Sequence, residues 1–279
     1  MRLAVITDEV SEDFETVAKW MNENGVEGAE LRGLWGDNVT KIDADARKRC
    51  KRIAKDYNLT ICGIASPFYK CNFEGEGGPT GPLHLAAQTP LDEQLKLLAH
   101  CLEIANEFET PFVRVFSFWR TEKLTDTLVT KIAEALAEPI KMAERAGVTL
   151  ILENEYSCML GSGEETARVF KMIDSPYIKV CWDPGNAFCA GETPFPNGYN
   201  AIKPYLAHVH IKDAVSSGGE DNFVIVGEGQ IDYAGQFKAL KADGYNGFLS
   251  LETHARIEGL TSDEISHRCI LGIRKLLEA

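Results

Sequence analysis

The sequence lacks several features that would point to a secreted or membrane protein. None of its eight cysteines forms a CxxC pair, and several lie inside apolar runs, where a free cysteine behaves as a small hydrophobic residue. There is no charged leader followed by a long apolar stretch and a small-residue cleavage site. No uncharged apolar run approaches the roughly 18 residues that span a bilayer. We therefore expect a soluble, cytoplasmic protein with reduced cysteines and no membrane partner.

Basic residues are scarce relative to acidic ones. The chain has 29 Lys and Arg against 42 Asp and Glu, which gives a net charge of −13. A field of this sign repels a polyphosphate backbone unless a local basic groove overcomes it. We therefore expect no nucleic-acid partner.

Internal repeats, low-complexity tracts and interdomain linkers are also absent from the sequence. Instead, eight short runs rich in β-branched and aromatic residues recur along the 279 residues, with helically spaced segments between them. This alternation predicts an α/β fold, a (β/α)₈ TIM barrel that forms a single domain over residues 1–279, since an open doubly wound sheet more often has five to seven strands. The predicted strands begin at Leu3, Gly28, Leu59, Phe112, Thr149, Ile178, Leu206 and Gly247, and helices are predicted over 13–24, 44–57, 91–108, 124–146 and 262–277.

Two longer segments interrupt the alternation of strands and helices. Residues 69–89 are rich in Gly and Pro, and residues 214–231 contain a Ser-Ser-Gly-Gly run. Both follow predicted strands and would lie over the C-terminal face of a barrel, where the active sites of this fold are built. We interpret both as candidate lids.

Four late strands carry an ionisable residue near their C-terminal ends, namely Glu153, Asp183, His210 and Glu252. Alternate residues of a barrel strand face the interior and the helices, and the helix-facing set must be apolar. In each of these strands the neighbouring apolar residues alternate with the ionisable residue, that is, they have the opposite parity and face the helices. All four polar side chains are therefore predicted to face the interior. The same register places Glu30, Arg32, Arg114, His208 and Ser250 on the inner face and Trp182 on the outer face.

Three carboxylates and an imidazole in one small volume repel or desolvate one another unless a cation neutralises them. One divalent metal is the economical explanation. The donor set suits Mn²⁺, Mg²⁺ or Co²⁺, leaves Zn²⁺ or Fe²⁺ open, and excludes a thiolate site. Taken alone, Asp183 is better explained as a helix N-cap, but the matching parity at four strand ends favours ligation. His208, two residues deeper than His210, either fills the interior or orients a metal ligand.

Motifs in the second half of the chain resemble those of the xylose isomerase-like TIM-barrel superfamily. This sugar phosphate isomerase/epimerase group includes ketose 3-epimerases, hydroxypyruvate isomerase, inosose dehydratase and class II AP endonucleases. The motifs, in family order, are LENE (152–155), WDPGN (182–186), HVHIKD (208–213), VGEGQID (226–232) and LSLETH (249–254). The resemblance implies that Glu153, Asp183, His210 and Glu252 hold the metal and that Glu153 and Glu252 are the catalytic acid/base pair.

Some positions depart from the family pattern. The AP endonucleases and the best-known epimerases have a His three residues after the strand-six Asp, where this chain has Asn186, and the chain has no early His before His84 for a three-metal cluster. Together with the net charge, these departures disfavour DNA repair. Many members have a His where this chain has Glu155. The candidate substrate-binding residues are Arg114, Glu155, Asn186 and Lys212. Arg114 and Lys212 either bind a substrate phosphate or carboxylate, or are solvated or paired with nearby acids at the rim of the barrel.

The resemblance implies a divalent-metal-dependent isomerase or epimerase. It would act on a small sugar, sugar phosphate or hydroxy-ketone by removing a proton next to the carbonyl, which gives an enediolate. One alternative is an inosose-type dehydratase, in which the same C–H abstraction is followed by loss of hydroxide. An alternative of another class is a non-catalytic sugar-binding barrel, although such a protein would be expected to lack a ligand or base. The expected partner is a small carbohydrate, and the sequence leaves the substrate, the metal and a homo-oligomeric state open.

Overall fold

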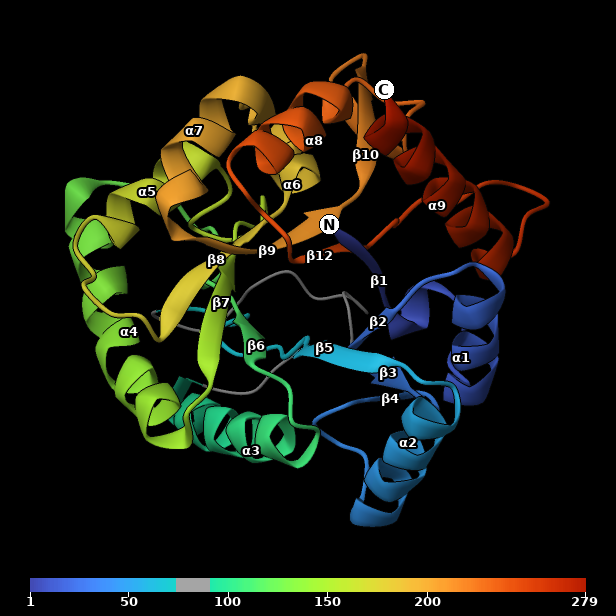
Figure 1. Ribbon diagram of the computed structural model, residues 1–279. Helices are drawn as coiled ribbons and strands as arrows, with labels where there is room; N and C mark the ends of the chain where they lie inside the picture. Colours follow the sequence, from blue (N-terminus) through green and yellow to red (C-terminus); the bar gives the residue numbers. More distant parts are fainter. Residues whose placement is uncertain (74–90) are drawn as a thin grey trace.

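Eight parallel strands close into a barrel, and helices cover its outside (Figure 1). The computed structural model describes residues 1–73 and 91–279. The predicted TIM barrel is confirmed, and each predicted strand start lies within one residue of the start of a barrel strand. The barrel strands are β1 (Arg2–Ile6), β2 (Gly28–Leu31), β5 (Thr60–Ile64), β6 (Phe112–Val115), β7 (Thr149–Glu153), β8 (Ile178–Trp182), β9 (Leu206–Ile211) and β12 (Phe248–Leu251).

The barrel closes where the first strand meets the last. β1 pairs in parallel with β12, with Arg2 opposite Phe248 and Val5 opposite Leu251, and on its other side β1 pairs with β2. Parallel neighbours align their carboxyl ends, so the residues that end these strands gather around one opening of the barrel.

Helices follow the barrel strands and include all five that were predicted. Their ends agree with the local signals: Gly147 ends α4 at a φ of +69°, a conformation that glycine adopts without strain, and the Glu264 carboxylate accepts the Thr261 N–H at 2.9 Å at the start of α9. The α-helices are α1 (Phe14–Glu23), α2 (Ala44–Asp56), α3 (Gln94–Glu107), α4 (Asp126–Ala146), α5 (Gly163–Phe170), α6 (Pro184–Cys189), α7 (Tyr199–Ile202), α8 (Tyr233–Ala242) and α9 (Ser262–Glu278). Shorter helical turns lie at Thr7–Glu9, Leu91–Glu93, Pro194–Gly198 and Lys203–Tyr205. Within the described residues, no helix is long and apolar enough to cross a membrane.

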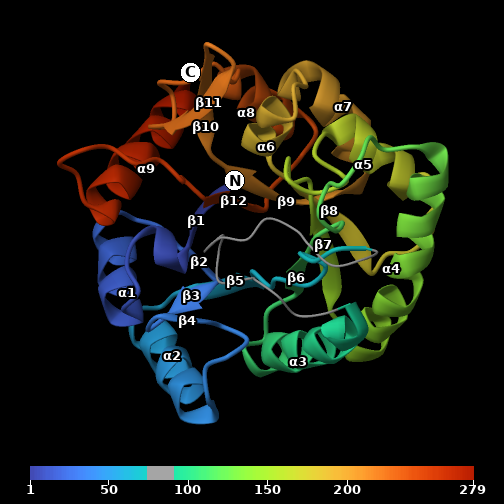
Figure 2. The same cartoon turned by 180° about the vertical axis from the view of Figure 1, so that it is seen from behind.

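The two inserts differ in what the structure describes. Most of the candidate lid at 69–89 lies outside the described residues. The insert at 214–231 contains most of an antiparallel hairpin, β10 (Asp213–Ser217) and β11 (Glu220–Val224), which lies near α6 and α8 in the view of Figure 2. A smaller hairpin joins β3 (Gly33–Leu34) and β4 (Asp37–Asn38). The role of the 214–231 insert as a lid stays a prediction.

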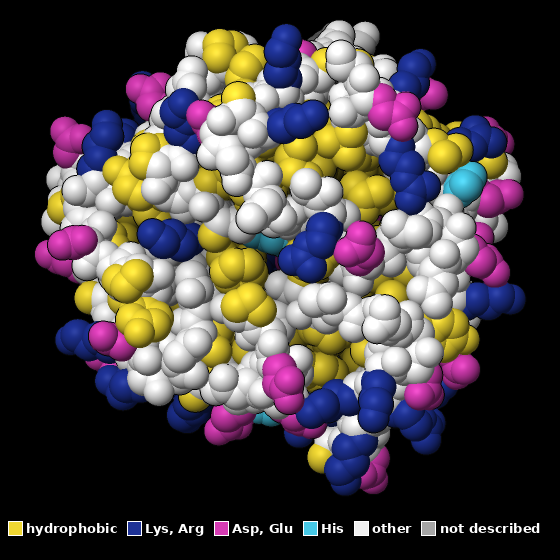
Figure 3. Space-filling view, viewed as in Figure 1, with side chains coloured by type: hydrophobic (Ala, Val, Ile, Leu, Met, Phe, Trp, Pro, Cys, Tyr) yellow, Lys and Arg dark blue, Asp and Glu magenta, His cyan; other side chains and the backbone are white. Residues whose placement is uncertain are grey.

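A cavity of about 650 Å³ opens at the end of the barrel opposite the carboxyl ends of the strands. Its lining includes the first residues of several strands, among them Arg2, Thr60, Phe112 and Phe248, and the Arg2 guanidinium lies 3.9 Å from the centre of the Phe248 ring. The space-filling view shows a small hollow near the centre of this face, with both apolar and basic side chains beside it (Figure 3). This cavity is therefore separate from the cluster of polar strand ends.

The core follows the predicted parity of the strands. Val180 and Trp182 on β8 are fully buried in the layer between the barrel and the helices, and the Trp182 Nε1–H donates to Gln236 Oε1 on α8 at 3.0 Å. Trp182 therefore faces the helices, as the alternation predicted, and the next residue, Asp183, faces the interior.

Replacing Trp182 with alanine is expected to lower the free energy of unfolding by about 3–5 kcal/mol, because it leaves a large cavity and an unpaired Gln236 amide. Urea denaturation measures the change. The control is Leu271→Ala on α9, an exposed leucine whose loss should cost under about 0.5 kcal/mol. Equal losses for the two variants would show that Trp182 is not packed between the barrel and the helices.

Candidate active site

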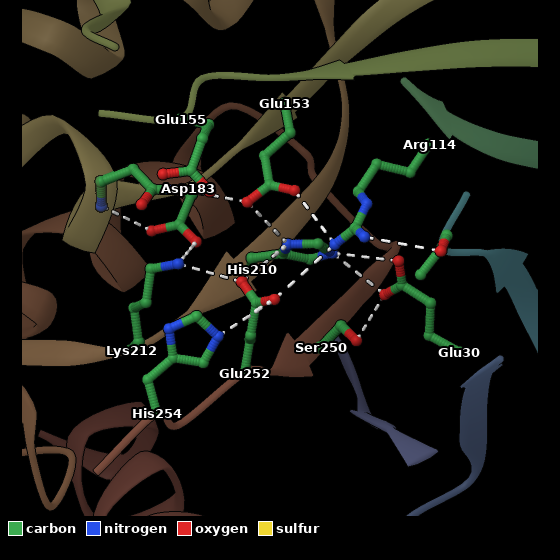
Figure 4. A network of polar contacts seen from close by, with 12 residues as sticks. Glu30, Arg114, Glu153, Glu155, Asp183, His210, Lys212, Ser250, Glu252 and His254 are labelled. Carbon is green, nitrogen blue, oxygen red and sulfur yellow. Dashed lines mark hydrogen bonds and ion pairs between the residues drawn. The ribbon is translucent and has the colours of Figure 1, made fainter. Parts of the chain in front are cut away.

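The structure brings together the four residues that the sequence predicted as metal ligands. Glu153 ends β7, His210 lies on β9, and Asp183 and Glu252 directly follow β8 and β12. All four are buried, and each offers one ligand atom such that these atoms lie within 4.8 Å of one another. Figure 4 shows their side chains converging on one point inside the barrel mouth.

Three buried polar atoms of this cluster make no hydrogen bond to the described residues, although Glu153 Oε2 lies in an ion pair with Arg114 and Asp183 Oδ2 in one with Lys212. They are Glu153 Oε2, Asp183 Oδ2 and His210 Nδ1. Buried polar atoms normally have a partner, and carboxylate oxygens with an imidazole nitrogen are a donor set that divalent cations accept. The residues present therefore fit a divalent metal.

Asp183 caps a helix with one carboxylate oxygen and points the other toward the cluster. Its Oδ1 accepts the Asn186 N–H at 2.8 Å and caps the start of α6, where Pro184 is the first helical residue. Its Oδ2 faces the cluster. Burial raises the pKa of Asp183 to about 6, and although Lys212 opposes this shift, Glu153 and Glu252 add to it. One carboxylate thus caps a helix and contributes to the site.

Glu30 on β2 lies behind His210 and fixes its orientation. The His210 Nε2 lies 3.0 Å from Glu30 Oε2, which leaves Nδ1 facing the cluster. The same oxygen is 3.0 Å from His208 Nε2 and accepts the Ser250 hydroxyl at 2.7 Å. Burial would raise the pKa of Glu30, but His210 and His208 outweigh it, so this pKa lies well below its usual range. His208 therefore acts on the cluster through Glu30.

Glu252 is held by cations on several sides. Arg32 Nη1 lies 2.5 Å from Glu252 Oε1, while the rest of the Arg32 guanidinium contacts Glu9 and Asp8. The Lys212 ammonium donates to Glu252 Oε2 at 3.0 Å. Burial would raise the pKa of Glu252, but Lys212, then His254 and then Arg32 hold this pKa well below its usual range. Glu252 is therefore a carboxylate with a fixed orientation.

The four candidate substrate-binding residues are all buried and lie at or beside the cluster. Arg114 Nη1 is 3.2 Å from Glu153 Oε2, and Lys212 Nζ is 3.0 Å from Asp183 Oδ2. The Asn186 amide donates to Glu153 Oε1 at 3.0 Å. Arg114 and Lys212 therefore pair with nearby acids, and their contact with a substrate stays a prediction.

Glu155 forms a separate buried ion pair beside the cluster. The Lys70 ammonium donates to Glu155 Oε2 at 3.0 Å and lies 4.4 Å from the centre of the Phe116 ring. Burial raises the pKa of Glu155, but Lys70 and then Lys212 lower it, so the pKa is about 2. Glu155 is therefore ionised at neutral pH and neutralised by Lys70.

Sequence reasoning missed the roles of Glu9, Lys70 and His254. His254 Nε2 lies 3.4 Å from Glu252 Oε1, and Glu9 accepts from Arg32 at 2.6 Å. Strand alternation could not have found either residue, because Glu9 lies in the 3₁₀ turn after β1 and His254 lies in the loop after β12 at a φ of +52°. Lys70 lies in a loop after β5, where no periodic pattern indicates the direction of a side chain.

The family is shown by comparison with known proteins. Residues 18–268 match the family model described as xylose isomerase-like TIM barrel. Because this match covers most of the chain, the protein belongs to this family, and the resemblance seen in the motifs is confirmed.

The individual relatives have low sequence identity to this chain. The chain is 31% identical over 134 residues to an uncharacterised protein of Methanocaldococcus jannaschii, a match that covers 47% of this chain and 45% of that protein. Fructoselysine 3-epimerase of Escherichia coli O157:H7 is 25% identical over 240 residues, 83% of this chain and 82% of that enzyme. Inosose dehydratase of Lacticaseibacillus casei is 21% identical over 143 residues, 46% of this chain and 48% of that enzyme. The chain thus spans about half the length of the first and third of these relatives.

A solved structure shares the fold across its whole length. The crystal structure of the IOLI protein with a bound zinc atom superposes with a TM-score of 0.78 at 16% identity, and covers 100% of this chain and 98% of that one. At this identity the likeness establishes the barrel and no more.

Proposed function

We propose that the protein is a divalent-metal-dependent isomerase or epimerase that acts on a small sugar or sugar phosphate by moving a proton next to a carbonyl. The observation that carries this proposal is the placement of two carboxylates, Glu153 and Glu252, above and below the His210 ring in the view of Figure 4. Glu153 Oε1 lies 3.5 Å and Glu252 Oε2 lies 3.7 Å from His210 Nδ1. The strands β7 and β12 that carry them are separated by β8 and β9 in the barrel.

The proposed ligands of the metal are Glu153, Asp183, His210 and Glu252. When bound, the metal would polarise the substrate carbonyl and acidify the neighbouring C–H. The donor set suits Mn²⁺, Mg²⁺ or Co²⁺ as well as Zn²⁺ or Fe²⁺, and the zinc atom in the structure of the IOLI protein, which shares the fold, supports a metal in this chain.

The chain's own residues supply the proton transfer. Glu153 and Glu252 would act as the acid/base pair, one on each side of the substrate carbon. The Asn186 amide and Arg114 hold the Glu153 carboxylate, and Arg32 holds that of Glu252. Because these carboxylates are buried and fixed, little reorganisation is needed when the proton moves. Arg114, Glu155, Asn186 and Lys212 are the proposed contacts to substrate, and His208 supports His210 through Glu30.

The comparisons favour an epimerase and keep one alternative. The relative named fructoselysine 3-epimerase aligns over 83% of this chain, which supports a keto-sugar substrate and epimerisation. The relative named inosose dehydratase supports the second candidate, a dehydratase that uses the same base. The two reactions share the abstraction of a proton and differ in whether water is lost.

Incubation of the metal-reconstituted protein with a panel of ketoses and with inosose in D₂O tests the proposal. Incorporation of solvent deuterium without loss of water supports the isomerase or epimerase. Loss of water from inosose supports the dehydratase. Binding of a sugar with neither reaction would indicate a non-catalytic sugar-binding barrel. The same protein stripped of metal is the control and should be inactive in each assay.

Replacing Glu30 with glutamine should weaken the binding of Mn²⁺ by about 10–100-fold, because a neutral amide holds His210 less firmly and lowers the basicity of its ring. Isothermal titration calorimetry of the metal-stripped protein measures the change. The control is Glu27→Gln, which changes an exposed residue just before β2. This variant should bind Mn²⁺ with the affinity of the wild type. Unchanged affinity in Glu30→Gln would show that Glu30 does not support a ligand.

A further inference from the structure

Lys212 places a cation inside the cluster of proposed metal ligands. The residue directly follows β9 and is fully buried. Its Nζ lies 3.0 Å from Asp183 Oδ2 and 3.0 Å from Glu252 Oε2. Figure 4 shows the Lys212 side chain extending between these two carboxylates. A single ammonium group therefore contacts two of the four proposed ligands, which come from different strands.

The surrounding structure holds the lysine in this position. The Lys212 backbone N–H donates to the Tyr233 hydroxyl at 3.2 Å, and the Tyr233 hydroxyl donates to the Lys212 carbonyl at 2.6 Å. The Lys212 stem packs against Gly185, since a Cβ at Gly185 would lie 2.4 Å from Lys212 Cγ. With the backbone and stem fixed, only the end of the side chain has freedom to move.

The charges of the cluster explain why a cation belongs there. Arg114 and Arg32 reach Glu153 Oε2 and Glu252 Oε1. Lys212 reaches two further oxygens of the cluster, Asp183 Oδ2 and Glu252 Oε2. Buried carboxylates this close to one another destabilise the fold unless a cation neutralises them. A divalent ion bound by the same two oxygens would meet a like charge at a few ångströms.

We propose that Lys212 is a built-in counter-cation that neutralises Asp183 and Glu252 when no metal is bound and competes with the divalent metal for both carboxylates. The inference rests on the proposed metal site. Lys212 thereby stabilises the metal-free protein and weakens metal binding, so that the bound ion remains exchangeable. On metal binding the ammonium leaves Asp183.

Metal affinity of the wild type and of Lys212→Met tests the competition. Methionine keeps the length and apolar contacts of the stem and removes the charge. Titration of the metal-stripped proteins with Mn²⁺ should show binding about tenfold tighter or more in Lys212→Met, because the competing cation is gone. Without metal, Lys212→Met should melt at a lower temperature than the wild type. Saturating Mn²⁺ should raise the melting temperature of Lys212→Met by more than it raises that of the wild type.

Lys203→Met is the matched control, because Lys203 is an exposed lysine that pairs with Asp243 at 3.2 Å near the opposite end of the barrel. It should bind Mn²⁺ as the wild type does. If Lys212→Met binds Mn²⁺ with an affinity equal to or weaker than that of the wild type, Lys212 does not compete with the metal, although the proposed metal site is still supported. If the wild type binds no divalent ion, both the proposed metal site and the inference about Lys212 are wrong.

Crystal structures of the wild type with and without Mn²⁺ give a second test that does not depend on the folding of the variant. The Lys212 Nζ should lie near Asp183 Oδ2 without metal and move away from it when Mn²⁺ is bound. A lysine that keeps its contact with Asp183 Oδ2 in the presence of the bound metal would overturn the competition.

Discussion

Replacing Glu153 with glutamine should lower the turnover number about 10²–10⁴-fold on the substrate that the ketose panel identifies. Glutamine retains the shape of the side chain, but it cannot accept a proton at neutral pH. The rate of deuterium exchange next to the carbonyl should fall by a similar factor, because the same step limits both. Steady-state kinetics and exchange followed by NMR, both at saturating metal, measure the two effects.

Two comparisons separate the loss of a base from other causes. The Mn²⁺ affinity of Glu153→Gln is measured in parallel, since Glu153 is also a proposed ligand and kinetics must be compared at equal metal occupancy. Glu138→Gln on the exposed face of α4 should retain full turnover. Full turnover in Glu153→Gln would show that another group is the base.

Replacing Lys70 with methionine should lower the free energy of unfolding by about 3–5 kcal/mol at neutral pH, because it leaves the buried Glu155 carboxylate without its partner. Urea denaturation measures the loss. The double variant Lys70→Met, Glu155→Gln should recover much of the stability, since no buried charge is left unpaired. Lys48→Met removes an exposed ion pair with Asp45 and should cost under about 0.5 kcal/mol.

The loss caused by Lys70→Met should also depend on pH with a definite sign. The pKa of Glu155 is about 2 in the folded protein, below its ordinary value of 4.5. The stability contributed by the pair is therefore fully present above pH 4.5 and is lost as the pH falls toward 2. The difference between the wild type and Lys70→Met should shrink over this range. A difference that stays constant down to low pH would exclude the ion pair as its cause.

The barrel strands could be predicted because their apolar residues must face the helices. In β8, for example, this requirement predicted that Trp182 faces the helices and that Asp183 faces the barrel interior, as the structure shows. The same rule brought Glu153, His210 and Glu252 to the inner face, and the convergence of parallel strand ends then brought all four together. The start of α3 was predicted three residues early, because Leu91–Glu93 forms a 3₁₀ turn before it.

The alternation of residues along a strand predicts whether a side chain faces the interior or the helices. It does not predict which residue that side chain contacts across the barrel. It placed Glu30 inside, but the contact with both His208 and His210 depends on the register between β2 and β9, which lie on different sides of the closed sheet. Lys212 could be assigned to the mouth but not to Asp183 and Glu252 in particular. Lys70 lies on a loop, where only the folded structure determines which acid it meets.

The closing of the barrel by β1 and β12 has a consequence during synthesis of the chain. Arg32 and Glu30 come early in the sequence, whereas Glu252 and Ser250, with which they pair, come more than 200 residues later. Until β12 has left the ribosome, Arg32 can pair with Asp8 and Glu9 but not with Glu252, and the first strand has no neighbour on one side. Contacts of such long sequence separation form slowly and late. The nascent chain therefore carries an open sheet edge until the segment that completes the site is made.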